Sequence, residues 1–377
     1  MGAAKKGSLP PEMQVSLASL KAPRPSRHPE QTDEPFAFQS REFLRELLVG
    51  KAVRFEVEYK VDTINRSFAA LYLDSANVNE MVARAGWAKV MEVDDPAKQK
   101  CSKVWHIVGP HLAQQQRGVC LQHYEELVRL SADAQKEKRG IYQEITDESE
   151  AVRHMNWEVD NPSKLLGEIK GVPVPALIEI VGTGSVYRVY LPKQEQWITM
   201  VLAGVVCPKM KGKPVESDDG ESKSQSYEPE PFAREAKHFV EARLLQRDIN
   251  VIINGTDKFN VGFARCGRRL VALLRAKFQN FLGVVDHPKG NIAVELLKHG
   301  YGKMADWSVG KHQRTVFFFA GPTGLFVLGF VEDKGAVFEM RNAERTAKLQ
   351  RLRLWQGFVP SASKLSGAKK FEGTVVE

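Results

Sequence analysis

One amphipathic pattern of apolar and small residues occurs twice along the chain. The first copy runs over Phe36, Ser40, Phe43, Leu44 and Leu48. The second, at the same spacing, runs over Phe232, Ala236, Phe239, Val240 and Leu244. Steps of three and four residues are typical of a helix with one buried face. Both copies begin with Glu-Pro-Phe-Ala, and proline suits the first position of a helix. The chain is therefore predicted to contain an internal repeat.

The segments after each helix also recur in order. The alternating residues 52–59 and the β-branched residues 249–253 each predict a strand. A short helix then ends at a glycine, Gly86 or Gly300, where a C-terminal cap needs positive φ. A longer charged helix completes each copy.

The two copies differ before the shared helix. Residues 176–182, 185–191 and 197–205 predict three strands in the second copy. The first copy shows only the last of them, over residues 14–20. We therefore predict a first repeat that is truncated at its N-terminal side.

Four parts of the chain follow from this comparison. We predict a first repeat over residues 1–145, a linker over 146–172, a second repeat over 173–360 and the start of a third over 361–377. Three inserts interrupt the repeats at about 104–122, 261–279 and 309–335. All three begin with valine and two end with glutamine. The codons of these residues can supply the GT and AG dinucleotides at the borders of an intron. The inserts are therefore interpreted either as unspliced introns or as genuine loops.

The predicted order of elements resembles that of the staphylococcal nuclease fold. It consists of strands, a helix, two more strands and two further helices. Val78-Asn-Glu with Gly86-Trp-Ala-Lys-Val90 is similar to its helix motif, and Asp33-Glu-Pro-Phe-Ala resembles the Tudor staphylococcal nuclease family. Leu245-Gln-Arg-Asp248 and Asp306-Trp-Ser308 add a likeness to plant members. The resemblance implies an α+β fold class, with tandem staphylococcal-nuclease-like OB-fold β-barrels and packed helices.

The family resemblance also implies a function. Its proteins carry four or five such repeats and a Tudor domain, and this chain resembles the first two repeats. RNA binding is implied, with roles in RNA silencing (RISC), RNA decay and stress granules, and with ribonucleoprotein and RNA-silencing components as partners. Since no Tudor domain is matched, we expect no methyl-arginine site in this stretch.

Nuclease chemistry of this kind needs carboxylates for Ca²⁺, a glutamate for water and two arginines. In the second copy the resemblance places Ser185 and Val206 at the carboxylate positions, Lys209 at the glutamate and Val201 at the first arginine. In the first copy Lys21 and Arg24 stand at the second carboxylate and the glutamate, and only Arg66 matches, at the second arginine. We predict no catalytic residue, no metal and no cofactor.

Cationic residues remain as candidates for nucleic-acid binding. We select Arg66, Arg188, Lys209 and Lys211. We expect a strip on the barrel surface that combines Lys209, Lys211 and Lys213 with Tyr187, Arg188 and Tyr190. A solvated loop and ordinary strand residues are an equal alternative. The net charge of +8 is weak support for nucleic-acid binding, because the three inserts carry most of the excess positive charge.

Other features narrow the class of protein. Four cysteines without paired short spacings fit a reducing compartment, and no export signal is visible, so we expect a cytoplasmic chain with the nucleus as a second location. The apolar run 316–331 is too short and too rich in glycine for a membrane span. A Ca²⁺-dependent RNA endonuclease and a pure protein-interaction platform remain alternatives, so enzymatic activity is left open.

Overall fold

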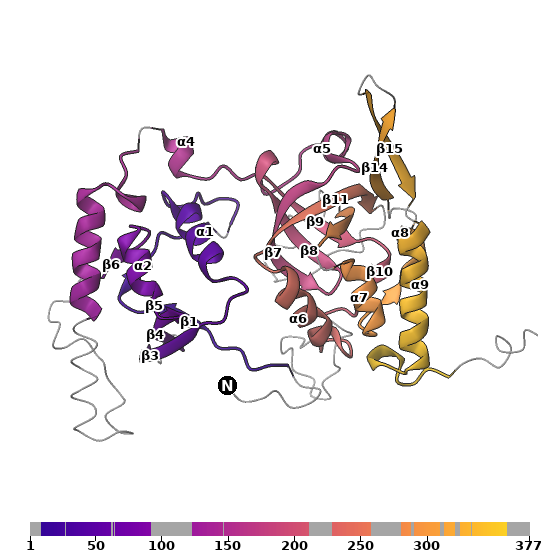
Figure 1. Ribbon diagram of the computed structural model, residues 1–377, viewed down its shortest axis with the longest axis horizontal. Coiled ribbons are helices and arrows are strands. Elements are labelled where there is room, and N and C mark those ends of the chain that lie inside the picture. The colour runs from indigo at the N-terminus through magenta and orange to yellow at the C-terminus, as the bar shows by residue number, and fades with distance from the viewer. Residues whose placement is uncertain are drawn as a thin grey trace, which may run out of the picture. The chain divides into compact units, whose positions relative to one another are not determined.

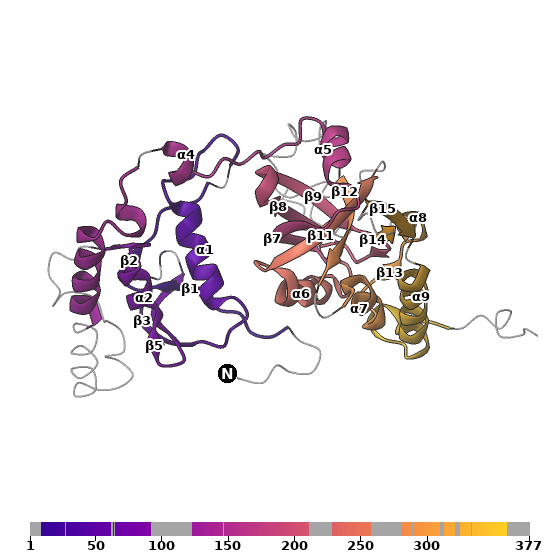
Figure 2. The same ribbon diagram turned by 45° about the horizontal axis from the view of Figure 1, so that its top comes forward.

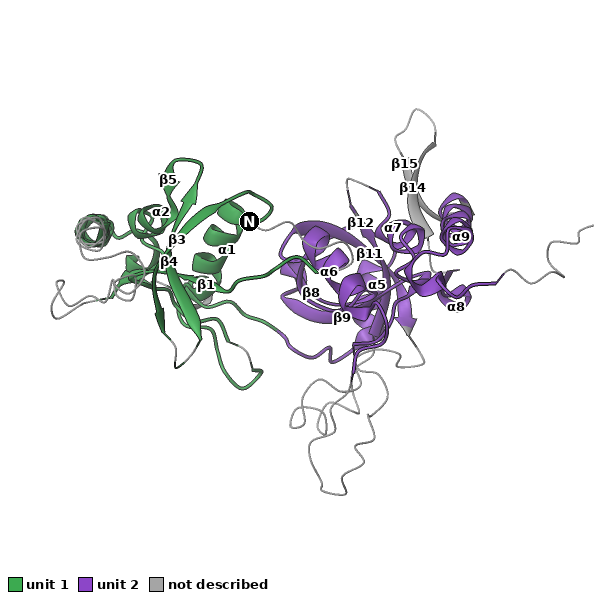
Figure 3. Ribbon diagram, turned by 90° about the horizontal axis from the view of Figure 1, so that it is seen from below, with its two compact units in different colours: residues 1–155 green, residues 156–377 purple. Residues whose placement is uncertain are grey.

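The computed structural model describes residues 9–26, 28–61, 63, 65–91, 123–145, 147–210, 228–257, 280–287, 290–309, 313–320, 325–332 and 334–359. The chain forms two compact units, residues 1–155 and 156–377 (Figure 3). Within the described residues, no helix has the length and apolar character needed to cross a membrane.

The second unit is built on a closed β-barrel. Its strands are β7 (Val174–Thr183), β8 (Val186–Leu191), β9 (Gln196–Leu202), β11 (Asp248–Asp257) and β12 (Asn280–Asp286). They close in the order β11-β12-β9-β8-β7. Figure 2 shows these strands gathered together in the second unit. The β12–β9 pair is parallel and the other pairs are antiparallel. This barrel confirms the predicted α+β class with an OB-type sheet.

Alternation along the strands fills the barrel. On β8, Tyr187 and Val189 are fully buried in the main core, while Arg188 between them points to the outer face. The other inward side chains include Ile198, Met200, Leu202, Ile253 and Phe281. The helices α6 (Ala233–Leu244), α7 (Ile292–Lys298) and α9 (Lys334–Leu349) add buried side chains to the same core.

The first unit contains an open version of this architecture (Figure 1). Its sheet holds β1 (Val15–Leu17), β4 (Arg66–Leu73) and β3 (Arg54–Val61) in that order, with β5 (Ala76–Asn77) on β4. The helices are α1 (Ala37–Leu48), α2 (Val78–Arg84) and a helix whose described part covers residues 123–136. The parallel β1–β4 pair corresponds to β9–β12 of the second unit.

Small backbone details repeat between the units. Phe36 and Phe232 both precede their helices in the left-handed region, at φ 62° and φ 64°. Short strand pairs recur too, β2 (Leu20–Lys21) with β6 (Lys89–Val90) and β10 (Val205–Val206) with β13 (Lys303–Met304). The predicted internal repeat is therefore present in the backbone itself.

The segment expected as a linker, residues 146–172, contains α4 (Glu148–Ala151) and α5 (Pro162–Ile169). Ile169 is buried in the barrel core, and the Gly171 N–H donates to the Ile253 carbonyl at 2.8 Å. The later part of this segment therefore packs as part of the second unit. The predicted repeat boundaries otherwise stay a prediction.

Several shorter elements complete the chain. They are α8 (Asp306–Val309), the antiparallel pair β14 (Gln313–Ala320) and β15 (Leu325–Glu332), and the 3-10 helices η3 (Gly140–Tyr142), η4 (Pro192–Gln194) and η6 (Arg353–Trp355). The β14–β15 pair falls in the expected insert 309–335. The inserts 104–122 and 261–279 and the segment 361–377 lie outside the described residues.

Candidate functional site

The first candidate site lies where the turn between β7 and β8 meets the end of β10. Ser185 is buried there, and its Oγ accepts a hydrogen bond from the Cys207 N–H at 3.2 Å. The Ser185 carbonyl accepts from the Leu202 N–H at 2.8 Å. Ser185, one of the two positions implied for metal carboxylates, therefore lies beside Cys207, the residue directly after the other position, Val206.

Other atoms pack closely against the backbone at Gly184 and Gly302. A Cβ on Gly184 would lie 2.8 Å from the Cys207 Sγ and 3.1 Å from the Ala236 Cβ. A Cβ on Gly302 would lie 2.7 Å from a Val205 methyl. Carbon and sulfur atoms therefore pack closely against the backbone of the glycine before Ser185.

The titrating groups here are unsuited to metal binding. Burial raises the pKa of the Cys207 thiol to about 12, against the opposing effect of its hydrogen bond with Ser185. A protonated thiol is a poor ligand at neutral pH. Burial also raises the pKa of Tyr187, whose hydroxyl donates to the Gly184 carbonyl at 2.7 Å. No group of three His, Cys, Asp or Glu side chains suited to a metal occurs among the described residues.

A cationic residue stands at the same place in both units. The Lys209 N–H donates to the Glu230 Oε2 at 2.9 Å, and the Glu230 N–H donates to the Lys209 carbonyl at 3.0 Å. Arg24 and Glu34 repeat both bonds, at 2.9 Å and 3.0 Å. Lys209 and Arg24 are exposed. The backbone thus fixes one exposed cation ahead of α6 and one ahead of α1.

Arg24 is a candidate that the sequence prediction did not select. The signal was present, because the repeat aligns Arg24 with Lys209 through the shared Ala/Cys-Pro step before them. What the sequence does not show is the matching glutamate contact, which holds both residues in one backbone geometry.

Arg66 begins β4, opposite Val61 and directly after a turn in which Asn65 has φ 46°. Its side chain is partly exposed. Within the part of the chain that the structure describes, its guanidinium makes no ion pair. This location fits a phosphate contact, which remains a prediction.

Arg188 is largely covered on the outer face of β8. Its Cζ lies 4.7 Å from the centre of the Trp197 ring, and Trp197 packs on Trp157 at 4.6 Å between ring centres. Burial lowers the pKa of Arg188, while the charge of Glu179 acts in the opposite direction. The side chain therefore helps hold residues near Trp157 on the barrel, and its role in binding stays a prediction.

The expected strip around Tyr187 is wrong. Tyr187 points into the barrel and is fully buried, so no base can stack on it, and Tyr190 is 3% exposed. Sequence alternation indicates that Tyr187 and Arg188 take opposite faces, but a closed barrel decides that the tyrosine face is the dry one. Lys211 and Lys213 lie outside the described residues.

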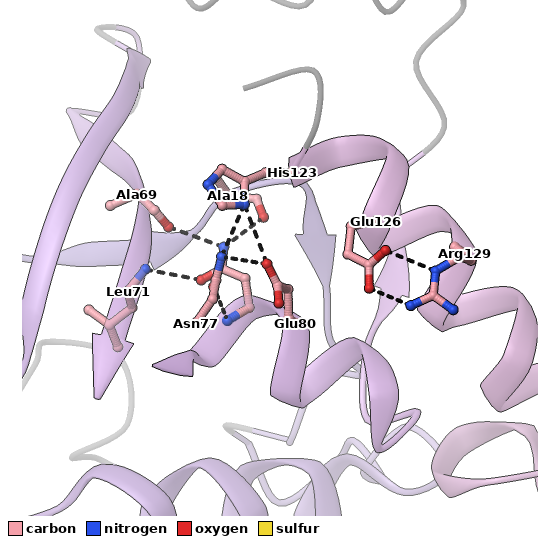
Figure 4. Close-up of polar contacts among 9 residues, drawn as sticks. Ala18, Ala69, Leu71, Asn77, Glu80, His123, Glu126 and Arg129 are labelled. Atoms are coloured by element: carbon pink, nitrogen blue, oxygen red, sulfur yellow. Dashed lines mark hydrogen bonds and ion pairs between the residues drawn. The ribbon is translucent and has the colours of Figure 1, made fainter. Parts of the chain in front are cut away.

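A polar cluster in the first unit joins α2 to the helix over residues 123–136 (Figure 4). The Glu80 Oε1 lies 3.4 Å from the His123 Nδ1 and accepts from the Asn77 Nδ2 at 3.2 Å. Burial raises the pKa of nearby Glu58, which the charge of His123 lowers and that of Glu56 raises. Sequence reasoning missed this cluster because His123 directly follows the insert 104–122.

The neighbouring Asn79 has a structural role. Its side chain accepts from the Leu71 N–H at 3.2 Å and donates to the carbonyls of Ala18 and Ala69 at 3.2 Å and 3.3 Å. These bonds fix α2 against β4 and the chain after β1. The polar groups around α2 therefore position elements, and they form no metal site.

Comparison with known proteins finds a matching family model and several similar proteins. The family model described as staphylococcal nuclease homologue matches residues 14–107. The chain is 31% identical to Staphylococcal nuclease domain-containing protein 1 of Drosophila melanogaster, over 99% of this chain and 34% of that protein. It is 30% identical to Ribonuclease TUDOR 2 of Arabidopsis thaliana, over 98% of this chain and 36% of that protein.

A third relative, Staphylococcal nuclease domain-containing protein 1 of Schizosaccharomyces pombe, is 30% identical over 94% of this chain and 34% of its own length. The chain thus spans about a third of the length of these curated relatives. The closed OB-type barrel, the backbone repeat and this likeness along nearly the whole sequence agree with one another. The chain belongs to the Tudor staphylococcal nuclease family.

Proposed function

We propose that the two units bind RNA as a scaffold and do not hydrolyse it at the former nuclease positions. One observation carries the proposal: both units hold an exposed cation, Arg24 or Lys209, in the same backbone geometry. A cation at that position can contact a phosphate oxygen without a metal. The carboxylates of Glu34 and Glu230 accept from the backbone N–H groups of these cations and would repel a phosphate. A bound phosphate must therefore approach from the side of the Arg24 or Lys209 side chain.

The absence of hydrolysis rests on the second barrel. Ca²⁺ needs several oxygen ligands, and the two carboxylate positions hold Ser185 and Val206. The Ser185 Oγ already accepts the Cys207 N–H, and neither side chain carries a carboxylate. Water activation at this place would therefore lack both the metal and the base.

Family membership supports a proposal for the cellular role. We propose that the chain acts in RNA silencing, RNA decay and stress-granule assembly, with ribonucleoprotein components as partners. Two relatives carry the name Ribonuclease TUDOR, so a Ca²⁺-dependent endonuclease is the competing function. We expect the protein in the cytoplasm, which cell fractionation checks.

A gel experiment separates binding from cleavage. End-labelled single- and double-stranded RNA is mixed with the full chain in Ca²⁺ or in EDTA, and matched native and denaturing gels are run. We expect shifted and intact RNA in both buffers. Fragments that appear only with Ca²⁺ would contradict the scaffold proposal and support the endonuclease.

Paired variants test the two cations. Arg24→Ala with Lys209→Ala should weaken binding to single-stranded RNA and reduce the salt slope of log K by about 0.7 for each phosphate that is no longer neutralised. The control, Lys136→Ala with Lys193→Ala, removes the same charge from exposed positions in the two units. Equal weakening by both pairs would show that net charge alone governs binding.

A further inference from the structure

Two aromatic rings stack on the sheet of the first unit. The centres of the Tyr59 and Phe68 rings lie 4.7 Å apart, and the ring planes differ by 11°. The two residues are directly opposite each other in the β3–β4 pair, and both are partly exposed. Directly opposite side chains on one face of a sheet are close neighbours, so the strand pairing itself holds the two rings together.

The burial pattern of β4 shows which face carries these rings. Successive side chains of a strand point to opposite faces. Ala69 is fully buried and Leu71 belongs to the core of the first unit, so their face is the inner one. Phe68 therefore lies on the outer face. A side chain on the outer face stays outside the core whichever strands lie at the edges of the sheet.

Arg66 supplies a positive charge beside the rings. It lies two residues before Phe68 in β4 and therefore shares its face. Its side chain is partly exposed. A guanidinium at this place can contact a phosphate through several N–H donors, while a ring next to it offers a π face to a base.

The other end of the same face is acidic. Arg54 pairs with Glu56 at 3.3 Å and covers the Tyr72 ring, with its Cζ 4.6 Å from the ring centre. Burial and then the charge of Glu56 raise the pKa of Tyr72, against the effect of Arg54. Glu58 and Glu80 add to this rise. A polyanion is repelled from this end, so the end that carries Arg66 is the one that suits nucleic acid.

The second unit has no ring at the corresponding positions. Both β3 and β11 carry one irregularity in register. The first pair after it is Tyr59–Phe68 in the first unit and Gly255–Leu282 in the second. Neither glycine nor leucine has a π face. The stacked pair is therefore a property of the first unit alone at this place in the sheet.

We propose that the first unit binds an unpaired base of single-stranded RNA on the Tyr59–Phe68 pair, with Arg66 on the adjoining phosphate. This proposal rests on the RNA-binding function proposed above, and it names the class of RNA. Every base has a π face, so stacking tolerates any sequence. The bases of a duplex are already stacked on one another, so the rings favour single strands. Arg24 and Lys209 contact phosphates only and do not make this distinction.

The test compares the affinity of the unaltered full chain and of Phe68→Leu for RNA by fluorescence anisotropy. One probe is a labelled oligouridylate, and the other has the same phosphates with stable abasic nucleotides. Leucine stays apolar but removes the π face, so binding of oligouridylate should weaken about fivefold or more while binding of the abasic strand stays unchanged. Phe338→Leu, at a residue 66% exposed on α9, is the matched control and should change neither affinity.

Salt dependence separates stacking from charge. Phe68→Leu should lower log K for oligouridylate equally at every salt concentration, because it removes no phosphate contact. Arg66→Ala should instead reduce the salt slope by about 0.7, the value for one phosphate on a single strand. A reduced slope in Phe68→Leu would contradict stacking, since the ring would then act only by positioning a cation.

A second position guards against misfolding. If circular dichroism shows that Phe68→Leu unfolds the first unit, Tyr59→Leu replaces it and should weaken binding in the same way. Tyr59→Phe keeps the ring and should retain full affinity. Equal losses from Tyr59→Phe and Tyr59→Leu would contradict stacking, because the hydroxyl group would then be the binding group.

Three further outcomes would overturn the proposal. Phe68→Leu could bind oligouridylate as tightly as the unaltered chain does. The unaltered chain could bind the abasic strand as tightly as the strand with bases. Phe68→Leu could also weaken binding of double-stranded RNA as much as binding of single strands. Each of these results leaves the RNA-binding scaffold standing, whereas an unaltered chain that binds no RNA would overturn both proposals.

Discussion

At the scale of single residues, the environment decides what a side chain can do. Cys207 is a nucleophile by type, yet its burial and raised pKa leave it a packing residue. Tyr187 and Arg188 are adjacent in sequence, but one fills the barrel core and the other lies against Trp197 outside it. Residue identity alone therefore overstates the binding surface of the second unit.

Glu58 gives a prediction at this scale. Its raised pKa means that ionisation opposes folding: the penalty is absent at pH values below the unfolded pKa and grows as pH rises through the folded one. Glu58→Gln removes a group that must ionise at neutral pH. We expect the variant to raise the melting temperature by a few degrees at pH 7 and to have little effect near pH 4.

The measurement is thermal unfolding across this pH range. Glu56→Gln on the same strand is the comparison variant: it removes the exposed ion pair with Arg54, worth about 0–1 kcal/mol, and the charge that adds to the raised pKa of Glu58. Its effect on the melting temperature at pH 7 should therefore be smaller than that of Glu58→Gln. A stabilisation by Glu58→Gln that is equal at both pH values would show that desolvation of the carboxylate is not its cause.

At the scale of elements, the repeat fixes more than helix and strand order. Asn77 and Asn291 cap α2 and α7 by accepting the N–H two residues on, both at 2.9 Å. Gly86 and Gly300 end those helices with φ 74° and φ 68°. The sequence shows these cap residues directly, which is why both helices were predictable.

The turn between β7 and β8 gives a prediction at the element scale. Gly184→Ala would place a methyl group 2.8 Å from the Cys207 Sγ, in a region with no space to spare. Overpacking of this kind costs about 1–3 kcal/mol, so the second unit should unfold at lower temperature. Adding Cys207→Ala should recover part of the stability, because it removes the sulfur atom in the way.

Gly167→Ala is the control for this change. Gly167 lies in α5 with nothing within 4 Å of its added Cβ. Alanine is about 0.5–1 kcal/mol better than glycine inside a helix, so this variant should be equally or more stable. A loss of stability from Gly167→Ala as large as that from Gly184→Ala would contradict the steric argument.

At the scale of the whole molecule, the two units differ in how completely their cores are enclosed. The closed barrel buries one large cluster that includes Tyr187, Met200 and Phe281. The main cluster of the first unit has Leu71, Val78, Val82 and Ala88 at its centre, and most of the apolar residues around them are only partly buried. Less apolar surface leaves water on folding, so the first unit gains less stability from burial.

We therefore predict two unfolding transitions. The first unit should unfold at lower denaturant concentration, and hydrogen exchange should be faster for β4 amides than for β12 amides. Urea titration followed by exchange at residues such as Leu71 and Val285 measures both. A single transition with equal protection in β4 and β12 would show that the units unfold together.

Local patterns in the sequence determined the repeat, the helices with their caps and most strand positions, while the family resemblance implied the loss of the nuclease carboxylates. These follow from periodicity, from cap residues and from residue types at matched positions. Only the tertiary structure decided which face of β8 is buried, that Cys207 packs against Gly184, and that His123 contacts Glu80 and Asn77. Such features depend on contacts between residues far apart in the chain. No local pattern encodes whether a barrel closes. Ile253 is buried in the closed barrel of the second unit, whereas Val57 in the open sheet of the first unit is exposed.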